Sequence, residues 1–318
     1  MKIRLNRSLA FIIIIFGSAI TFTQNFIFDL GGVLIDTHKI ASLRHMGPLN
    51  IAQYSLQLKI SPFALHNQIK SVLFEILEQT ADFHDLHKNN SLHLACDENG
   101  TLLPYLMRAW LQGTMTCAEI RSLIHETTIQ NTGWFKNKAE QRIFTNMVNM
   151  IFTPEHFVST RKIDPAGLEF IKKCKKHGHN VYALSNWDAE SFQLLKAKHA
   201  DLFDLFDGIV ISGTTNCLKP HPSIYHTLLQ EYKLKADDCW FIDDQQENVN
   251  AAQSLGINAV VHTACFKKLV ENIQIAIYSK SLTLRKDLNI MGINVSNTNP
   301  TSNAIIEGEN ISPGDSTK

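Results

Sequence analysis

The C-terminal half of the chain alternates short apolar runs with longer segments that carry helix signals. One helix is predicted to begin at Asp164, where an N-cap residue precedes Pro165, and to end at Gly178. Further helices are predicted around 190–195, over 222–232 and up to 256, and apolar runs predict strands at 26–28, 181–184, 209–211, 239–242 and 259–261. This alternation predicts an α/β fold with a parallel sheet.

The segment 37–160 has a different pattern. Apolar residues recur with helical spacing from Leu65 to Ile76, which indicates an amphipathic helix. Thr116 and Glu119 have the spacing of a capping box at the start of another helix. No strand is expected there, so the segment is predicted to be an all-helical insertion between the first two strands.

The two ends of the chain differ from the rest. Basic residues at positions 2, 4 and 7 precede an apolar run over 9–20, so residues 1–24 have the proportions of a signal peptide or N-terminal anchor. The rest of the chain would then be translocated, and a cytoplasmic protein with a stray extension or buried helix is the alternative. The tail, 285–318, is rich in Asn, Ser and Thr and is predicted to be disordered.

Charge and cysteine spacing narrow the function further. Lys+Arg and Asp+Glu both count 30, so the chain lacks the basic excess of a nucleic-acid binder, and a small molecule is the expected partner. No two cysteines have CxxC spacing, which argues against a structural zinc site. His84 and His87 are interpreted as solvated histidines rather than metal ligands, and His221 as a turn residue between two prolines. The polar stretch 79–100 contains no recognisable motif.

Candidate catalytic residues lie at or just beyond the carboxyl ends of the predicted strands, the edge where open α/β sheets bind ligands. They are Asp29, followed by Gly31 and Gly32; Ser185 and Asn186; Lys219; and Asp243 with Asp244. Three carboxylates that converge with little compensating positive charge imply a divalent cation. Oxygen-only ligands favour Mg²⁺.

The same residues suggest a reaction. Asp29 is placed to act as a carboxylate nucleophile, which divides hydrolysis into two easier steps. Ser185 and Asn186 supply hydrogen-bond donors for phosphate oxygens. Lys219 supplies a positive charge that offsets those of the nucleophile and the phosphate.

In this order, the four segments resemble the four motifs of the haloacid dehalogenase-like (HAD) hydrolase superfamily. The resemblance implies Asp29 as nucleophile, Ser185 as second-motif hydroxyl, Lys219 as third-motif lysine and Asp243-Asp244 as the acidic pair. It also implies a Rossmann-like core formed by 25–36 and 161–284, with 37–160 as an inserted helical cap that closes over the site and sets specificity.

One position departs from the family pattern. HAD phosphatases commonly carry a second aspartate two residues after the nucleophile, as the acid that protonates the leaving group, and Gly31 stands there in this chain. Its backbone carbonyl remains as a metal ligand beside Asp29 and Asp244, with Asp243 as an orienting group or second acidic ligand. Loss of this proton donor predicts a turnover rate that is lower by a factor of about 10²–10⁴.

The prediction from the sequence is therefore a Mg²⁺-dependent phosphatase that acts on a small phosphorylated metabolite through an aspartyl-phosphate. A haloacid dehalogenase is the first alternative, although it needs no metal and leaves Asp243-Asp244 without a role. A phosphomutase would depend on the acid missing at position 31. The third alternative is a weakly active or non-catalytic binding protein of the same fold. Neither the substrate nor the oligomeric state follows from the sequence.

Overall fold

The computed structural model describes residues 23–59, 62–89 and 92–263, and beyond these 265, 266, 268, 269 and 273, all within one compact unit. The apolar N-terminal run and the polar tail, on which the signal-peptide and disorder predictions rest, lie outside the described residues. Among the described helices, none has the length and apolar character to cross a membrane. Gln24, near the start of the described residues, is buried, and its carbonyl accepts a hydrogen bond from the Asn180 N–H (3.0 Å).

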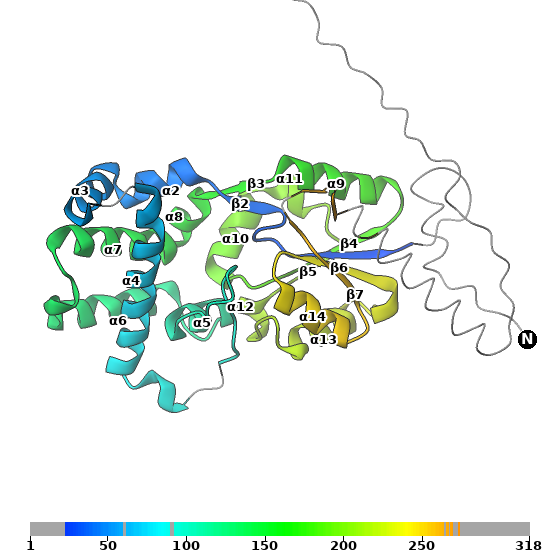
Figure 1. Ribbon diagram of the computed structural model, residues 1–318. Helices are drawn as coiled ribbons and strands as arrows, with labels where there is room; N and C mark the ends of the chain where they lie inside the picture. Colours follow the sequence, from blue (N-terminus) through cyan, green and yellow to red (C-terminus); the bar gives the residue numbers. More distant parts are fainter. Residues whose placement is uncertain are drawn as a thin grey trace, which may run out of the picture. The chain divides into compact units, whose positions relative to one another are not determined.

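A five-stranded parallel sheet forms the centre of the α/β unit, as predicted (Figure 1). The strand order is β5-β4-β1-β6-β7, so the strand that leads to Asp29 is the middle one. The strands are β1 (Asn25–Phe28), β4 (Asn180–Ser185), β5 (Gly208–Ile211), β6 (Cys239–Asp243) and β7 (Asn258–Val261). Each lies within two residues of its predicted position.

Helices cover both faces of this sheet. On one face, Ile27 of β1 and Leu184 of β4 share a buried cluster with residues of α13 (Pro222–Glu231) and α14 (Gln246–Ser254). On the other face, Phe26 and Phe28 pack edge-on against Phe170 of α9 (Pro165–Lys176). Because successive side chains of a strand point to opposite faces, a continuous apolar run is what a strand buried on both sides requires.

The predicted ends of α9 are confirmed. The Asp164 carboxylate accepts hydrogen bonds from the N–H groups of Ala166 and Gly167, both at 3.2 Å, and Pro165 occupies the first turn. The chain leaves the helix through Gly178, whose φ of +76° is in the left-handed region that favours glycine.

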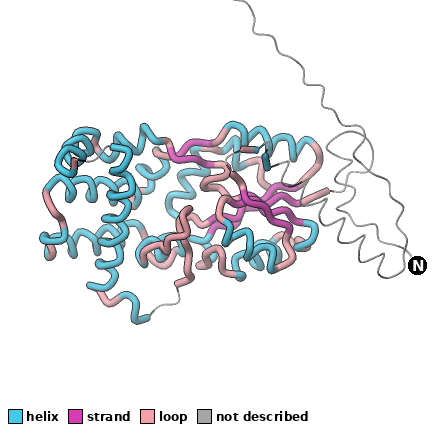
Figure 2. Tube along the Cα trace, in the orientation of Figure 1, coloured by secondary structure: helices cyan, strands magenta, loops and turns pink. Residues whose placement is uncertain are grey.

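Between the first two strands of the sheet, the chain forms a set of helices with its own hydrophobic core (Figure 2). The Thr116–Glu119 capping box is present as predicted, and Ile69 and Ile76 are buried. The helices are α2 (Lys39–Met46), α3 (Pro48–Leu58), α4 (Pro62–Phe83), α5 (Tyr105–Gln112), α6 (Cys117–Gln130), α7 (Lys138–Ile151) and α8 (Pro154–Ser159), with short 3₁₀ turns at Leu86–Asn89 and Thr132–Trp134.

A short antiparallel pair not expected from the sequence joins this helical segment to the sheet. Strands β2 (Ile35–Thr37) and β3 (Arg161–Ile163) pair at the two boundaries of the insertion. Inside the segment, Cys96 and Leu102 form an isolated antiparallel bridge. The expectation of no strand applied to 37–160, and of the two paired strands only Thr37 lies within that segment. The pair was not predicted because runs of three residues carry no readable alternation.

Candidate active site

The predicted catalytic residues converge at the carboxyl ends of the three central strands. Asp29 follows β1 directly, Ser185 ends β4, and Asp243 ends β6. Lys219 comes from the loop between α12 (Ser212–Thr215) and α13. Because these parallel strands are neighbours, residues more than 150 positions apart in sequence meet at one edge of the sheet.

Asp29 is held in place by backbone and side-chain hydrogen bonds. Its N–H donates to the Ile242 carbonyl (2.9 Å), and its Oδ1 accepts from the Leu30 N–H (2.7 Å). Lys219 Nζ lies 2.9 Å from the same Oδ1. Burial raises the pKa of Asp29 to about 6, with a further increase from the Asp243 charge, although Lys219 and a hydrogen bond from Ser185 oppose the rise.

Lys219 is the positive charge of the site and is almost completely buried, with 1% of its side chain exposed. Its Nζ also donates to Asp243 Oδ2 at 2.6 Å, so one ammonium group bridges two carboxylates. Burial alone would lower the pKa of Lys219, but the Asp243 and Asp29 carboxylates more than offset this and raise it. Lys219 therefore stays charged between its two partners.

Asp243 and Asp244 have different surroundings. The first is fully buried: its Oδ1 accepts from the Gln245 N–H (2.8 Å) and from Asn248 Nδ2 (2.9 Å), and its Oδ2 accepts from Lys219. Asp244 is partly exposed, and burial together with the Asp29 and Asp243 charges raises its pKa to about 7. Asp243 thus has the contacts of an orienting group, while Asp244 has a carboxylate available to a ligand.

The two glycines after the nucleophile have separate requirements. Gly32 has a φ of +72°, and a Cβ there would lie 2.2 Å from Asp244 Oδ2. Gly31 is outside the left-handed region, and a Cβ there would meet no atom within 4 Å. Only Gly32 is needed for backbone conformation and for the close approach of Asp244. Nothing in the backbone excludes an aspartate at position 31.

Ser185 and Asn186 take different roles in the geometry. Ser185 is buried and hydrogen-bonds to the Asp29 carboxylate. The Asn186 side chain binds the backbone of Lys219 twice: its Oδ1 accepts from the Lys219 N–H (2.8 Å) and its Nδ2 donates to the Lys219 carbonyl (3.0 Å). Asn186 therefore positions the lysine loop, and its expected contact with phosphate stays a prediction.

Sequence reasoning did not identify Asn248, which lies in the first turns of α14. Its side chain donates to Asp243, and its carbonyl accepts from the hydroxyl of the fully buried Tyr225 (2.9 Å). The available signal was a polar residue five positions after Asp243 on the buried side of a helix. The sequence alone does not show which face of that helix is buried.

The two histidines of the H-x-x-H segment contact different partners. His84 Nε2 is 2.9 Å from Thr127 Oγ1, and His87 Nε2 is 3.3 Å from Asp82 Oδ1. His84 is half-buried and His87 is exposed.

The donor set at the sheet edge fits a hard divalent cation. Asp29, Asp243 and Asp244 each place a carboxylate oxygen within 4.8 Å of the others, and Lys219 supplies one compensating charge. Burial first, and the neighbouring carboxylate charges after it, raise the pKa values of Asp29 and Asp244, so a bound cation would stabilise their ionised forms. Oxygen ligands with a partly open side match the requirements of Mg²⁺.

The chain belongs to the haloacid dehalogenase-like hydrolase family, whose model matches residues 23–256. That match spans the helical insertion, the candidate site residues described above and every strand of the sheet except β7, which begins at Asn258. The family resemblance inferred from the four motifs is therefore confirmed, and the chain is a hydrolase by family.

Curated relatives match the chain over shorter stretches. A protein named sesquiterpene phosphatase astK, from Aspergillus oryzae, is 36% identical over 87 residues, which cover 27% of this chain and 44% of that protein. Drimenol cyclase drtB of Aspergillus calidoustus is 31% identical over 103 residues, covering 31% of this chain and 19% of that protein. The chain thus spans less than half the length of each of these two relatives.

Solved structures of the same superfamily match over most of the chain. A HAD family enzyme from Bacteroides thetaiotaomicron, in complex with magnesium and inorganic phosphate, is 19% identical with a TM-score of 0.46, covering 76% of this chain and 96% of that chain. The L-2-haloacid dehalogenase of Xanthobacter autotrophicus is 14% identical with a TM-score of 0.42, covering 76% of this chain and 77% of that one.

Proposed function

We propose that the protein is a Mg²⁺-dependent phosphatase that hydrolyses phosphate monoesters through an aspartyl-phosphate at Asp29. One observation carries the proposal. At the carboxyl end of the central strand, Lys219 forms an ion pair with Asp29, and Asp243 and Asp244 lie beside them. A single buried ammonium group does not neutralise three carboxylates, so negative charge remains to bind a divalent cation. The bound cation would in turn neutralise the charge of an incoming phosphate.

In the first step, an oxygen of the Asp29 carboxylate attacks phosphorus, and the ester P–O bond breaks. Asp29 Oδ1 is held by the Leu30 N–H and Lys219, so we assign the attack to Oδ2. The leaving alkoxide takes its proton from water, because Gly31 has no side chain to supply one. In the second step, water hydrolyses the acyl phosphate, which releases phosphate and regenerates Asp29.

The surrounding groups stabilise the charge that moves during both steps. Lys219 keeps Asp29 ionised and oriented, and Asp243 holds Lys219 from the other side. Ser185 is close enough to Asp29 to donate to a phosphate oxygen once the ester is bound. When bound by Asp29, Asp244 and the Gly31 carbonyl, Mg²⁺ would supply electrostatic stabilisation of the phosphoryl oxygens.

One curated relative favours phosphate ester chemistry. The relative named as a sesquiterpene phosphatase is similar to about a quarter of this chain. A dehalogenase would use Asp29 without a metal, and the partly exposed carboxylate of Asp244 would then have no function. We therefore rank the dehalogenase second, and a non-catalytic binding protein third.

The physiological partner in this proposal is a small phosphorylated metabolite, and the protein contacts neither nucleic acid nor, apart from its N-terminal segment, a membrane. That segment, on its sequence, directs the catalytic unit across or onto a membrane, with a cytoplasmic protein as the alternative. The expected partner and the role of the N-terminal segment are inferred from the sequence.

Activity of the purified protein on an aryl phosphate tests the proposal. Hydrolysis should require Mg²⁺, stop with EDTA and return when Mg²⁺ is restored. Asp29→Asn should lose turnover and keep its melting temperature, and the exposed Asp201→Asn serves as the matched control. Metal-independent halide release from 2-chloropropionate, with no phosphatase activity, would establish the dehalogenase instead.

A further inference from the structure

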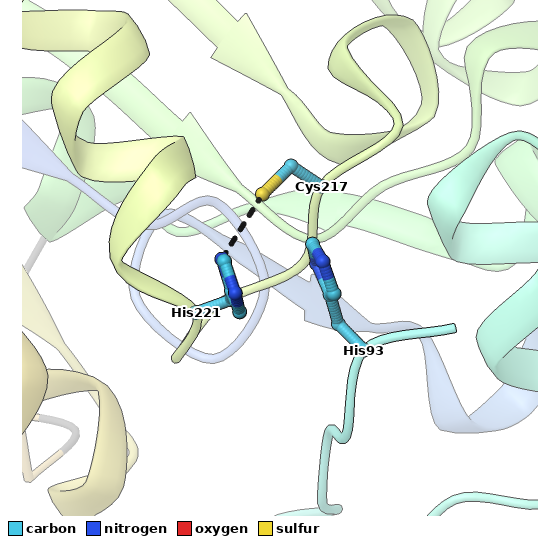
Figure 3. Close-up of side chains that lie close together, drawn as sticks. All are labelled: His93, Cys217 and His221. Atoms are coloured by element: carbon cyan, nitrogen blue, oxygen red, sulfur yellow. Dashed lines mark hydrogen bonds between the residues drawn. The ribbon is translucent and has the colours of Figure 1, made fainter. Parts of the chain in front are cut away.

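Three side chains with nitrogen and sulfur donors meet outside the carboxylate site. Cys217 and His221 lie at the two ends of the loop that carries Lys219, and His93 comes from the polar stretch 79–100 of the helical insertion (Figure 3). One donor atom from each of the three lies within 4.8 Å of the other two. The spacing of the cysteines did not indicate this group, because Cys217 and His221 lie 124 and 128 positions after His93.

The separations are close to those of a metal site. Cys217 Sγ lies 3.7 Å from His221 Nδ1. A tetrahedral ion with metal–sulfur and metal–nitrogen bonds of about 2.3 and 2.0 Å would hold these two atoms about 3.5 Å apart. The rings of His93 and His221 are stacked, with centroids 3.8 Å apart and planes 5° from parallel. Binding would therefore require the rings to turn out of the stack so that their lone pairs converge.

In both histidines Nδ1 accepts a hydrogen bond from a backbone N–H. Nδ1 of His93 accepts the Leu218 N–H, and Nδ1 of His221 accepts the Ser223 N–H, both at 3.3 Å. An accepting Nδ1 carries a lone pair, so the proton of each neutral ring is on Nε2. Hydrogen bonds of this length are weak, and a metal–nitrogen bond would replace each at little loss.

Burial and access also favour an ion. Cys217 is buried, His93 is half-buried, and His221 is exposed, so an ion can enter from solvent past His221. The donor set differs from the oxygen-only set around Asp29, since thiolate and imidazole select zinc-like ions rather than Mg²⁺.

We propose that His93, Cys217 and His221 form a second metal site, which binds Zn²⁺ through Sγ and the two Nδ1 atoms with a fourth position open to solvent. The Cys217 thiol releases its proton to solvent when the Zn–S bond forms, and the two backbone N–H groups give up their contacts. The ion joins the helical insertion to the loop that carries Lys219. This inference does not depend on the proposed phosphatase activity.

Cobalt(II) titration of the full-length protein tests the site directly. Co²⁺ reports tetrahedral geometry through visible d–d absorption and thiolate ligation through a charge-transfer band in the near ultraviolet. Millimolar Mg²⁺ is kept present to occupy oxygen-only sites. We expect both signals to saturate at about one equivalent and to disappear when Zn²⁺ is added. Cys217→Ser should lose the charge-transfer band, and His93→Ala should lose the tetrahedral absorption.

Cys265→Ser is the matched control, because this thiol is exposed and outside the cluster, and it should bind Co²⁺ as wild type does. Circular dichroism establishes that each variant is folded. His93→Ala carries the test should Cys217→Ser not fold, since His93 is half-buried in a segment outside the sheet. Absence of a thiolate band in wild type, its persistence in Cys217→Ser, or an unchanged tetrahedral absorption in His93→Ala would overturn the assignment.

Discussion

The Asn186 side chain and the backbone of Lys219 form two reciprocal hydrogen bonds, of 2.8 and 3.0 Å, across 33 positions of sequence. They join the end of β4 to the lysine loop and fix the point from which the Lys219 side chain reaches Asp29. Removing them should displace the ammonium group without removing it.

Asn186→Ala should therefore lower both stability and turnover. An unpaired Lys219 N–H in a buried site costs about 1–3 kcal/mol of unfolding free energy. A misplaced Lys219 should reduce kcat by about 10²-fold. Chemical denaturation and steady-state kinetics measure the two effects, with the exposed Asn250→Ala as control. Unchanged kcat in a folded Asn186→Ala protein would show that Asn186 does not position Lys219.

Alanine at the two glycines should separate their roles. Gly32→Ala forces a side chain into a φ of +72° and against Asp244 Oδ2, which should cost about 1–2 kcal/mol from backbone strain and weaken Mg²⁺ binding. Gly31→Ala meets open space and should leave the melting temperature within about 2 °C. Thermal unfolding with and without Mg²⁺ compares the pair. Equal tolerance at both positions would contradict the geometry of this turn.

Gly31→Asp should restore a proton donor for the leaving group. The wild-type protein is expected to hydrolyse aryl phosphates with acidic phenols much faster than alkyl phosphates, whose leaving groups need a proton. The variant should narrow that gap by speeding alkyl substrates selectively, by about 10²-fold. Rates on both substrate classes, alongside melting temperature, measure this. A stable variant with no selective gain would mean that another group already serves as the acid.

Stabilisation by Mg²⁺ should depend on pH. Asp29 and Asp244 have pKa values of about 6 and 7 in the folded protein, above the unfolded value of about 3.9, so the metal-free protein loses stability as pH rises from about 4 to about 7. Mg²⁺ binds the ionised carboxylates and offsets this loss. The increase in melting temperature that Mg²⁺ produces should therefore grow between about pH 5 and pH 8.

Variants of the acidic pair check the origin of that dependence. Asp244→Asn should reduce the Mg²⁺-induced shift at every pH, because it removes a carboxylate ligand. Asp243→Asn should chiefly lower the melting temperature, because it weakens contacts with Lys219, Gln245 and Asn248. A pH-independent shift, or an unchanged metal response in Asp244→Asn, would refute the ligand assignment.

The sheet and most residues of the candidate site could be predicted from the sequence, for a physical reason. Parallel strands end at a common edge, so Asp29, Ser185 and Asp243 had to meet once each was placed at a strand end. Lys219 could be placed there by family resemblance. The bulk of the insertion was readable because its helices carry capping signals and apolar stripes.

Contacts between distant segments were not readable in the same way. Asn186 was predicted to donate a hydrogen bond to phosphate. Its contacts with Lys219 could not be predicted, since nothing in the sequence shows that a side chain hydrogen-bonds to the backbone 33 positions away. His221 looked like a turn residue between prolines, yet it stacks on His93, which lies 128 positions earlier. The pair β2–β3 was too short to show a strand pattern. These features depend on tertiary packing rather than local pattern.

The most direct test of the proposed chemistry is detection of the covalent intermediate. An acyl phosphate is reduced by borohydride to an alcohol, which converts aspartate to homoserine. Acid-quenched reactions with an aryl phosphate and Mg²⁺, treated in this way and analysed by peptide mass spectrometry, should show homoserine at position 29. The signal should be absent without substrate and in Asp29→Asn. Active turnover with position 29 always recovered as unmodified aspartate would contradict nucleophilic catalysis by Asp29.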